Sequence, residues 1–230
     1  LGFGTALLGI LVPLALEKHL SAILLMGMVA VVMMYIAGTN PKWLLAGAAA
    51  AAVFVIVYIR FMGYAGDRVT AWLHPEADPG DTGYQILQSL YAIGSGGVFG
   101  LGFGKSRQKY LYLPFQYNDY IFAICCEELG LLGALAIIAL FAAMIFRGYW
   151  IALHGADRFS TVLASGLVTL IAVQTILNLC VVTNLLPSTG IALPFFSYGG
   201  TALAVNLGEM GIVLQISRYR NHRKIQEEPL

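Results

Sequence analysis

The sequence predicts an all-α protein that crosses a membrane with about six helices. Of its 230 residues, 59% are hydrophobic and only 11% are charged, whereas an ordinary soluble domain has about 25% charged residues. The mean hydropathy is +0.78. Several apolar runs approach the roughly 20 residues that a spanning helix needs, and they lack the alternation of a barrel strand. Backbone polar groups cannot stay unpaired in lipid, so we expect these runs to form helices.

The predicted spans follow one another along the chain. Uninterrupted Leu, Ala, Ile and Val place them near residues 1–16, 19–37, 43–62, 120–146, 160–184 and 200–217. The first run is short, and the chain opens in it without an initiator Met or a charged leader. We therefore expect no signal peptide, and we expect the chain to be the carboxy-terminal part of a longer protein.

Basic residues beside the spans predict the orientation. Four of them follow the last span closely: Arg218, Arg220, Arg223 and Lys224. Lys and Arg are enriched on the cytoplasmic side, so the carboxy terminus is expected to be cytoplasmic. Counting back from that end places 63–119 and 185–199 outside the cell. The prediction is one partial transmembrane domain over residues 1–230, with a long extracytoplasmic loop, 63–119, inside it.

The first half of this loop contains a predicted helix with the sequence GYQILQSLYAI. Its apolar face consists of Ile86, Leu90 and Ile93, and the polar positions off that face are Gln85, Gln88 and Ser89. This spacing is typical of a helix that lies at the membrane surface.

A glycine-rich stretch, GSGGVFGLGFGKS, follows that helix. It does not fit a nucleotide-binding loop, because the Walker pattern requires Gly where the chain has Phe99, and no strand precedes it. We interpret the glycines as flexible or close-packing positions.

Composition also excludes two other kinds of site. A net charge of +1 without a dense basic arm gives no basis for nucleic-acid binding. Three cysteines, Cys125, Cys126 and Cys180, lie in apolar runs without the spacing of a disulfide framework or a metal site. We expect them to be small packing residues.

Three carboxylates near the start of the 120–146 run form the first candidate site: Asp119, Glu127 and Glu128. A carboxylate at the bilayer centre costs at least about 2.5–3.5 kcal/mol, so these groups should face a cavity, pair with a cation or lie near the interface. On one straight helix, Glu127 would lie about 12 Å deeper than Asp119, and Glu128 would point about 100° away from Glu127. Two alternatives stay open: Asp119 as a helix cap, and Glu127 and Glu128 as purely structural hydrogen-bonding groups.

The second candidate site is the stretch 184–202, NLLPSTGIALPFFSYGGTA. Its helix-breaking residues are Pro187, Gly190, Pro194, Gly199 and Gly200. Its hydroxyl groups belong to Ser188, Thr189, Ser197 and Tyr198. Irregular backbone at membrane depth is tolerated only where it faces protein or a wet cavity, and a helix starting after the paired glycines can direct free N–H groups at an anion. A plain turn between two helices is the alternative. We expect this stretch to lie beside Asp119, whose ionised carboxylate would face an aqueous pocket outside the cell.

Three blocks of the sequence resemble one family. LPSTGIALPFFSYGGTAL with EMGIVLQISR is similar to the carboxy-terminal signature of the SEDS family (FtsW, RodA, SpoVE), proteins of shape, elongation, division and sporulation. The blocks GYQILQSLYAIGSGGVFGLGFGKSRQKYLYLP and NDYIFAICCEELGLLG match it in the same order. Members have about ten transmembrane helices, so the resemblance implies that this chain contains the last six.

The resemblance implies a peptidoglycan glycosyltransferase that polymerises lipid II at the outer face of the bacterial cytoplasmic membrane. It also implies a class B penicillin-binding protein and other divisome or elongasome proteins as partners. The family's essential aspartate falls on Asp119, although relatives have His-Thr where this chain has Tyr117 and Asn118. A carboxylate within reach of the acceptor sugar hydroxyl can remove its proton as the bond forms.

The remaining expected site residues would bind the lipid-linked substrate. They are Lys105, Arg107, Gln108, Lys109, Glu127, Glu128, Pro187, Ser188, Thr189, Gly190, Pro194, Ser197, Tyr198, Gly199 and Gly200. No cofactor is expected with certainty, and a divalent cation, Mg or Mn, held by Asp119 against the diphosphate stays open.

Two other functions stay open. A flippase that moves lipid II would fit the polar residues Gln174, Asn178 and Asn206 within the spans. Transporters often show paired helix breaks from two repeats, however, and this sequence has one break and no repeat. A structural scaffold that recruits the penicillin-binding protein would not need the carboxylate at position 119.

Overall fold

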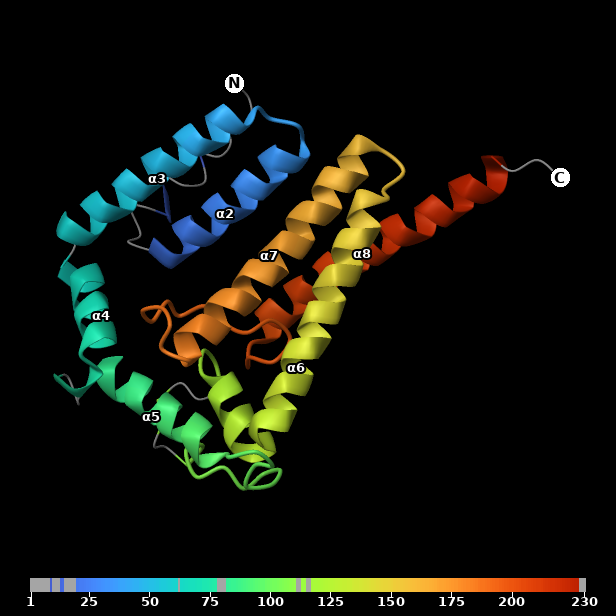
Figure 1. Ribbon diagram of the computed structural model, residues 1–230. Helices are drawn as coiled ribbons and strands as arrows, with labels where there is room; N and C mark the ends of the chain where they lie inside the picture. Colours follow the sequence, from blue (N-terminus) through green and yellow to red (C-terminus); the bar gives the residue numbers. More distant parts are fainter. Residues whose placement is uncertain are drawn as a thin grey trace. The chain divides into compact units, whose positions relative to one another are not determined.

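A computed structural model of the chain describes residues 9, 13–14, 20–61, 63–77, 82–110, 113–114 and 117–227 (Figure 1). Within these ranges every regular element is a helix and there is no strand, so the all-α fold class is confirmed. The predicted span near 1–16 lies almost entirely outside the described residues.

The chain forms two compact units, and each is described by itself. Unit 1 comprises Leu1–Ile56, Met144–Val173 and Ala204–Leu230, and unit 2 comprises Val57–Ala143 and Gln174–Leu203. Helices α6 (Ile121–Leu153), α7 (Arg158–Val182) and α8 (Gly200–Glu227) each contribute residues to both units.

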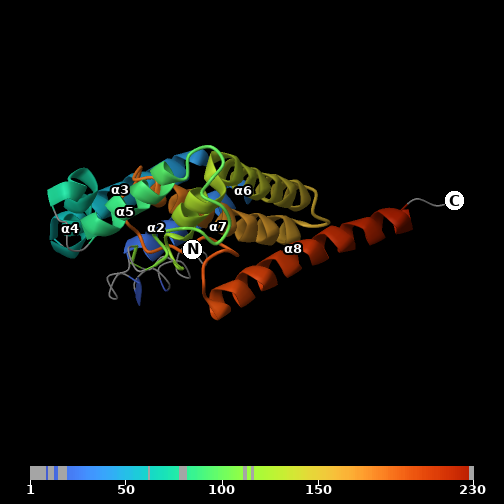
Figure 2. The same cartoon turned by 90° about the horizontal axis from the view of Figure 1, so that it is seen from below.

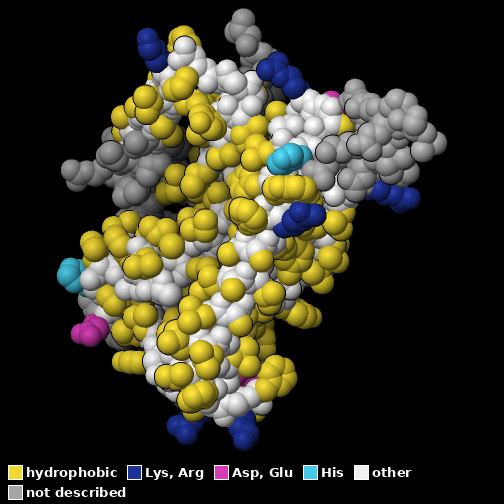
Figure 3. All heavy atoms as spheres, turned by 45° about the vertical axis from the view of Figure 1, so that its right-hand side comes forward, with side chains coloured by type: hydrophobic (Ala, Val, Ile, Leu, Met, Phe, Trp, Pro, Cys, Tyr) yellow, Lys and Arg dark blue, Asp and Glu magenta, His cyan; other side chains and the backbone are white. Residues whose placement is uncertain are grey.

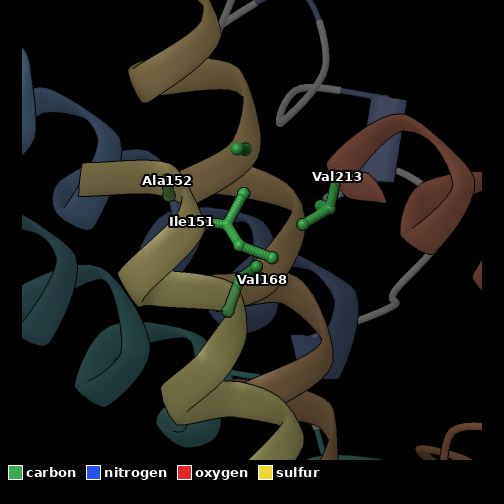
Figure 4. Close-up of a cluster of buried hydrophobic side chains, with 5 residues drawn as sticks. Ile151, Ala152, Val168 and Val213 are labelled. Carbon is green, nitrogen blue, oxygen red and sulfur yellow. The ribbon is translucent and has the colours of Figure 1, made fainter. Parts of the chain in front are cut away.

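Unit 1 contains α2 (Leu20–Ile36), most of α3 (Pro41–Phe61) and the adjoining parts of α6, α7 and α8. The segments of α6 and α7 on either side of their connecting turn lie side by side (Figures 1 and 2). A cluster of buried side chains from α6, α7 and α8 packs together in this unit: Ile151, Ala152, Ala164, Val168 and Val213 (Figure 4). The Asp157 carboxylate accepts a 2.7 Å hydrogen bond from Ser160 N, which caps the start of α7.

Unit 2 contains α4 (Gly63–Leu73), a 3₁₀ turn η1 (Pro75–Ala77) and α5 (Thr82–Ser95), which contact one another. The sequence pattern predicted a loop where the structure has α4, so this helix was not predicted. The helix predicted from GYQILQSLYAI is confirmed as α5, but the placement of Ser89 off its buried face is wrong. Ser89 is fully buried, and its hydroxyl donates a 2.8 Å hydrogen bond to Val182 O. A small hydroxyl can be buried when its donor is satisfied in this way.

Helix α6 is interrupted at Gly130, where φ is 66° and ψ is −169°. The lime-green helix before this break runs in a different direction from the long yellow helix after it (Figure 1). The expectation that Glu127 lies about 12 Å deeper along one straight helix is therefore wrong. Glu127 and Glu128 instead stand just before the break. Leu131–Leu153, 23 residues, extends about 34 Å, enough to cross a bilayer core of about 30 Å.

Two helices of the described chain, α6 and α7, are long and apolar enough to cross a membrane. Helix α2 is apolar but has only 17 residues. Hydrophobic side chains cover most of the described surface seen in Figure 3. Several large ones on α6 are more than half exposed: Leu131, Leu132, Leu135, Leu140 and Phe146. Exposed apolar surface of this extent is typical of a protein that contacts lipid or a partner.

Candidate functional site

The acidic turn, residues 117–120, carries Asp119 immediately before α6. Its three successive carbonyls are each held by a hydrogen bond of 2.7 Å. Tyr198 N donates to Tyr117 O, Ser197 Oγ donates to Asn118 O, and Asn178 Nδ2 donates to Asp119 O. The first two donors come from the segment between α7 and α8, and the third comes from α7 itself. The backbone beneath Asp119 is thereby fixed from two sides.

Residues 184–199, between α7 and α8, form the proline-glycine hairpin. It is folded by internal contacts, among them a 2.7 Å hydrogen bond from Leu193 N to Ser197 Oγ. Gly190 has a φ of 70°, a conformation that favours glycine. A Cβ placed on Gly190 would lie 3.6 Å from Asp119 Oδ2. The carboxylate of Asp119 therefore lies beside the hairpin, as the sequence predicted for these two candidate sites.

The electrostatic setting of Asp119 combines burial with a nearby cation. The side chain is half-buried. Burial raises the pKa of the Asp119 carboxyl, because desolvation disfavours its charged form, and the charge of Arg68 on α4 acts in the opposite direction. Burial dominates, so the pKa lies above the ordinary value of 3.8. A carboxylate of raised basicity is better suited to accept a proton.

Helix α4 bonds to the hairpin through two side chains on one face. Arg68 Nη1 donates to Ser188 O at 3.0 Å, and Trp72 Nε1 donates to Asn184 O at 3.0 Å. Positions four apart in a helix lie on the same side, so both side chains reach the same segment. Arg68 was not among the expected site residues. If α4 had been predicted as a helix, the four-residue spacing of Arg68 and Trp72 would have placed both side chains on one face.

Glu127 and Glu128 form a second cluster with the loop 104–109. We call the two glutamates and this loop the carboxylate clasp. Glu127 is 1% exposed, and its carboxylate accepts hydrogen bonds from Ser106 Oγ, from Arg107 N at 3.0 Å and from Gln108 N at 3.3 Å. Adjacent positions on a helix do not share a face, yet both carboxylates accept hydrogen bonds from this one loop. These contacts favour the structural alternative for the glutamates.

The partners of Glu128 complete the clasp. Its carboxylate accepts 2.8 Å and 3.2 Å hydrogen bonds from Gly104 N and Ser106 N, and it pairs with Lys109 Nζ at 3.0 Å. Lys109 Nζ also donates to Gly104 O. The hydrogen bond to Glu128 raises the pKa of the Lys109 ammonium group. Lys109 thus neutralises one carboxylate of the clasp.

Three glycines allow the loop to pack directly on the backbone of α6. A Cβ on Gly96 would lie 2.1 Å from Cys126 O, one on Gly100 would lie 2.1 Å from Glu128 O, and one on Gly130 would lie 2.3 Å from Gly100 N. Any side chain larger than hydrogen would force these backbones apart. The interpretation of the loop glycines as close-packing positions is confirmed for Gly96 and Gly100.

The other predicted site residues lie in two groups. In the clasp loop, Lys105 and Arg107 are exposed and Gln108 is half-buried. In the hairpin, Tyr198 is 84% exposed, Pro194 is fully buried, and Thr189 has a buried hydroxyl without a hydrogen-bond partner among the described residues. Pro187 and Ser188 are half-buried, and α8 begins at Gly200, directly after Gly199, as expected.

A metal site made by the protein alone is not evident. No group of three or more His, Cys, Asp or Glu side chains that could hold an ion occurs in the described part of the chain. Asp119 could supply a carboxylate ligand to Mg²⁺ or Mn²⁺, with further ligands coming from substrate and water.

Comparison with known proteins places the chain in a family. Residues 3–222 match the family described as "Cell cycle protein" (FTSW_RODA_SPOVE). The chain is 43% identical over 212 residues to the probable peptidoglycan glycosyltransferase FtsW of Geobacter sulfurreducens, an alignment that covers 92% of this chain and 57% of that protein. It is 48% identical over 155 residues to stage V sporulation protein E of Bacillus subtilis, covering 67% of this chain and 42% of that protein.

A solved structure gives the same result. The fold matches a chain of a peptidoglycan synthase complex, solved to show the coordination of polymerization and crosslinking, with a TM-score of 0.78 and 27% identity. That match covers 95% of this chain and 61% of the other. The sequence thus spans a little over half the length of the FtsW relative. With nearly all of its residues matched, the chain belongs to the cell cycle protein family that contains FtsW, RodA and SpoVE.

Proposed function

We propose that this chain is part of a peptidoglycan glycosyltransferase that polymerises lipid II, with Asp119 as the general base. The observation that carries the proposal is the placement of Asp119, whose half-buried carboxylate lies beside the hairpin on a turn with three bonded carbonyls. The names of the FtsW relatives support the activity.

The proposed chemistry needs one base and a site for the leaving group. A sugar hydroxyl is a weak nucleophile at neutral pH, and the Asp119 carboxylate would take its proton as the glycosidic bond forms. The diphosphate of the donor lipid leaves with increased negative charge. The exposed cations Lys105 and Arg107 would bind this diphosphate, and the first N–H groups of α8 at Gly200 would add further donors.

The carboxylate clasp would serve the same site indirectly. Glu127 and Glu128 hold the backbone of the loop that carries Lys105 and Arg107. We assign these glutamates to positioning that loop rather than to direct contact with substrate. A substrate-bound divalent cation that uses one Asp119 oxygen stays part of the proposal, to be tested by chelation.

The proposal places the chain in the bacterial cytoplasmic membrane with six spans, residues 63–119 outside and the carboxy terminus in the cytoplasm. The apolar exposed face of α6 and the basic residues in the carboxy-terminal part of α8 support this topology. A class B penicillin-binding protein is the proposed partner, supported by the match to a complex that joins polymerization to crosslinking. The alternative of a flippase is less favoured, since Asn178 uses both N–H donors on protein carbonyls.

The test uses the full-length enzyme with its penicillin-binding partner in liposomes and fluorescent lipid II. Asp119→Asn keeps the size of the side chain and removes the base, so glycan chain synthesis should fall by at least about 100-fold while partner binding persists. Asp157→Asn, on the α6–α7 turn, is the matched control and should leave synthesis unchanged. Polymerisation by Asp119→Asn at the wild-type rate would refute the assignment, and selective loss of lipid movement would favour transport.

A further inference from the structure

Asn178 on α7 is the buried polar group that the proposed chemistry does not use. It is 1% exposed, and its Nδ2 donates to Asp119 O at 2.7 Å and to Ile191 O at 2.8 Å. The two acceptors belong to the acidic turn and to the proline-glycine hairpin, 59 and 13 residues away in sequence. One side chain therefore connects both parts of the candidate site.

We propose that Asn178 is a positioning residue, whose amide sets the spacing between the Asp119 turn and the hairpin and so fixes the Asp119 carboxylate. The inference rests on the proposed function, because a positioning role needs a reaction at Asp119. Asn178 itself does not touch substrate.

The orientation of the amide follows from its partners. Both acceptors are backbone carbonyls, which can only accept, so the group facing them must be the NH₂ and not the oxygen. The NH₂ has two hydrogens, and both are used. The side chain cannot turn without losing these bonds, and this makes it a fixed link rather than an adaptable one.

The remaining atom of this amide argues against a packing role. Asn178 Oδ1 is buried and has no hydrogen-bond partner among the described residues. A buried acceptor without a partner is destabilising, and an apolar side chain of similar size would avoid that cost. An asparagine is nonetheless present, which indicates that its two donors are what the site requires.

Other bonds near the site show what the Asn178 link adds. Tyr198 N and Ser197 Oγ also join the hairpin to the acidic turn, but they bind the carbonyls of Tyr117 and Asn118. Asn178 binds the carbonyl of Asp119 itself. Loss of this bond would release the peptide unit of Asp119 while the rest of the turn stayed in place.

The test again uses the full-length enzyme with its partner in liposomes and fluorescent lipid II. The variants are Asn178→Ala, which removes both donors, and Asn178→Asp, which keeps the volume and turns an oxygen toward two carbonyls. The matched control is Thr183→Val, because the hydroxyl of Thr183, the residue directly after α7, donates only to carbonyls of that helix, Leu179 O and Cys180 O.

We expect kcat to fall by about 100-fold in both variants, since a misplacement of about 1 Å can cost that much, with KM for lipid II little changed. Thr183→Val should stay within about twofold of the wild type. In Asn178→Ala the acid limb of the pH profile should move to lower pH, because a released carboxylate is better solvated and its pKa falls. Arg68, whose charge acts on Asp119 in the structure, is unchanged in this variant.

Wild-type kcat in both variants would overturn the inference. So would a lowered kcat with an unmoved acid limb and a reduced unfolding temperature, which would assign Asn178 to the fold. If Asn178→Ala does not purify as a single species, Asn178→Asp still decides the question through kcat and KM. Activity in Asp119→Asn would instead refute the proposed function, so the two failures are distinguishable.

Discussion

Replacing Glu127 with Gln tests the carboxylate clasp directly. Glu127 accepts three hydrogen bonds, from Ser106 Oγ, Arg107 N and Gln108 N, and is almost completely buried. Hydrogen bonds to charged groups contribute about 1.5–3 kcal/mol each and neutral ones about 0.5–1.5 kcal/mol. The substitution therefore removes about 1 kcal/mol from each bond, or about 3 kcal/mol in all, if the side chain keeps its place.

The loss of stability should be confined to the loop 104–109, because the three donors all belong to it. We expect the backbone amides of Arg107 and Gln108 to exchange with deuterated solvent about 100-fold faster in Glu127→Gln than in the wild type, since about 1.4 kcal/mol corresponds to a factor of ten. Peptides from residues 104–110 of the full-length protein, analysed by mass spectrometry, report this change. The KM for lipid II should rise as well, because Lys105 and Arg107 lie on the loosened loop.

A matched control is Glu76→Gln, which changes an exposed carboxylate of η1 within the same predicted loop. It should leave exchange across 104–110 unchanged. If Glu127→Gln altered exchange at Arg107 and Gln108 by less than threefold, the clasp would not hold the loop, and the positioning role of the glutamates would be refuted.

Two further substitutions test the electrostatics and the backbone packing. The proposed base must be ionised, so kcat/KM should be lost as pH falls through the Asp119 pKa, which burial raises above 3.8. In Arg68→Gln that midpoint should move to higher pH, and an unchanged or lower midpoint would contradict the role of Arg68. In Gly100→Ala the new Cβ would lie 2.1 Å from Glu128 O at a φ of 79°, so the unfolding temperature should drop, with a cost of about 3 kcal/mol. Gly97→Ala, where nothing lies within 4 Å at a φ of 53°, should cost only about 1 kcal/mol, and an equal loss in both would exclude close packing as the cause.

The helices could be predicted wherever apolar composition alone determines them. The runs at 19–37, 43–62, 120–146, 160–184 and 200–217 all correspond to helices, because an apolar run of that length has few other ways to satisfy its backbone. Helix α4 was missed because GYAGDRVTAWL has neither an apolar run nor a cap that would announce it.

The break at Gly130 was missed for a different reason. A glycine inside an apolar run is usually tolerated within a helix, and local sequence gives no sign that this one changes direction. The break is held by a distant segment, since Leu131 N and Leu132 N donate to Gly97 O and Val98 O. A conformation fixed by contacts some thirty residues away cannot be deduced from its own neighbours.

The candidate site was predicted in part. Asp119 and the hairpin were expected to lie together, and the approach of Gly190 to the carboxylate agrees with that expectation. The role of the residues that hold them together was not expected. Ser197 and Tyr198 were expected to bind substrate, whereas both donate to main-chain carbonyls, and every residue has a carbonyl, so such bonds leave no motif in the sequence. Asn178 was noted only as a polar residue within a span.

The same bonds explain how this chain can differ from its relatives just before the aspartate. The family resemblance implies His-Thr where this chain has Tyr117 and Asn118, yet the bonds that hold these two positions end on their carbonyl oxygens. Carbonyl acceptors are independent of side-chain identity, so the turn can keep its geometry when both side chains change. The turn instead depends on the three groups that donate to these carbonyls: Tyr198 N, Ser197 Oγ and Asn178 Nδ2. The constraint on the position of Asp119 therefore lies in the hairpin and α7, far from the aspartate in sequence, and substitutions there should affect catalysis more than substitutions at 117 and 118.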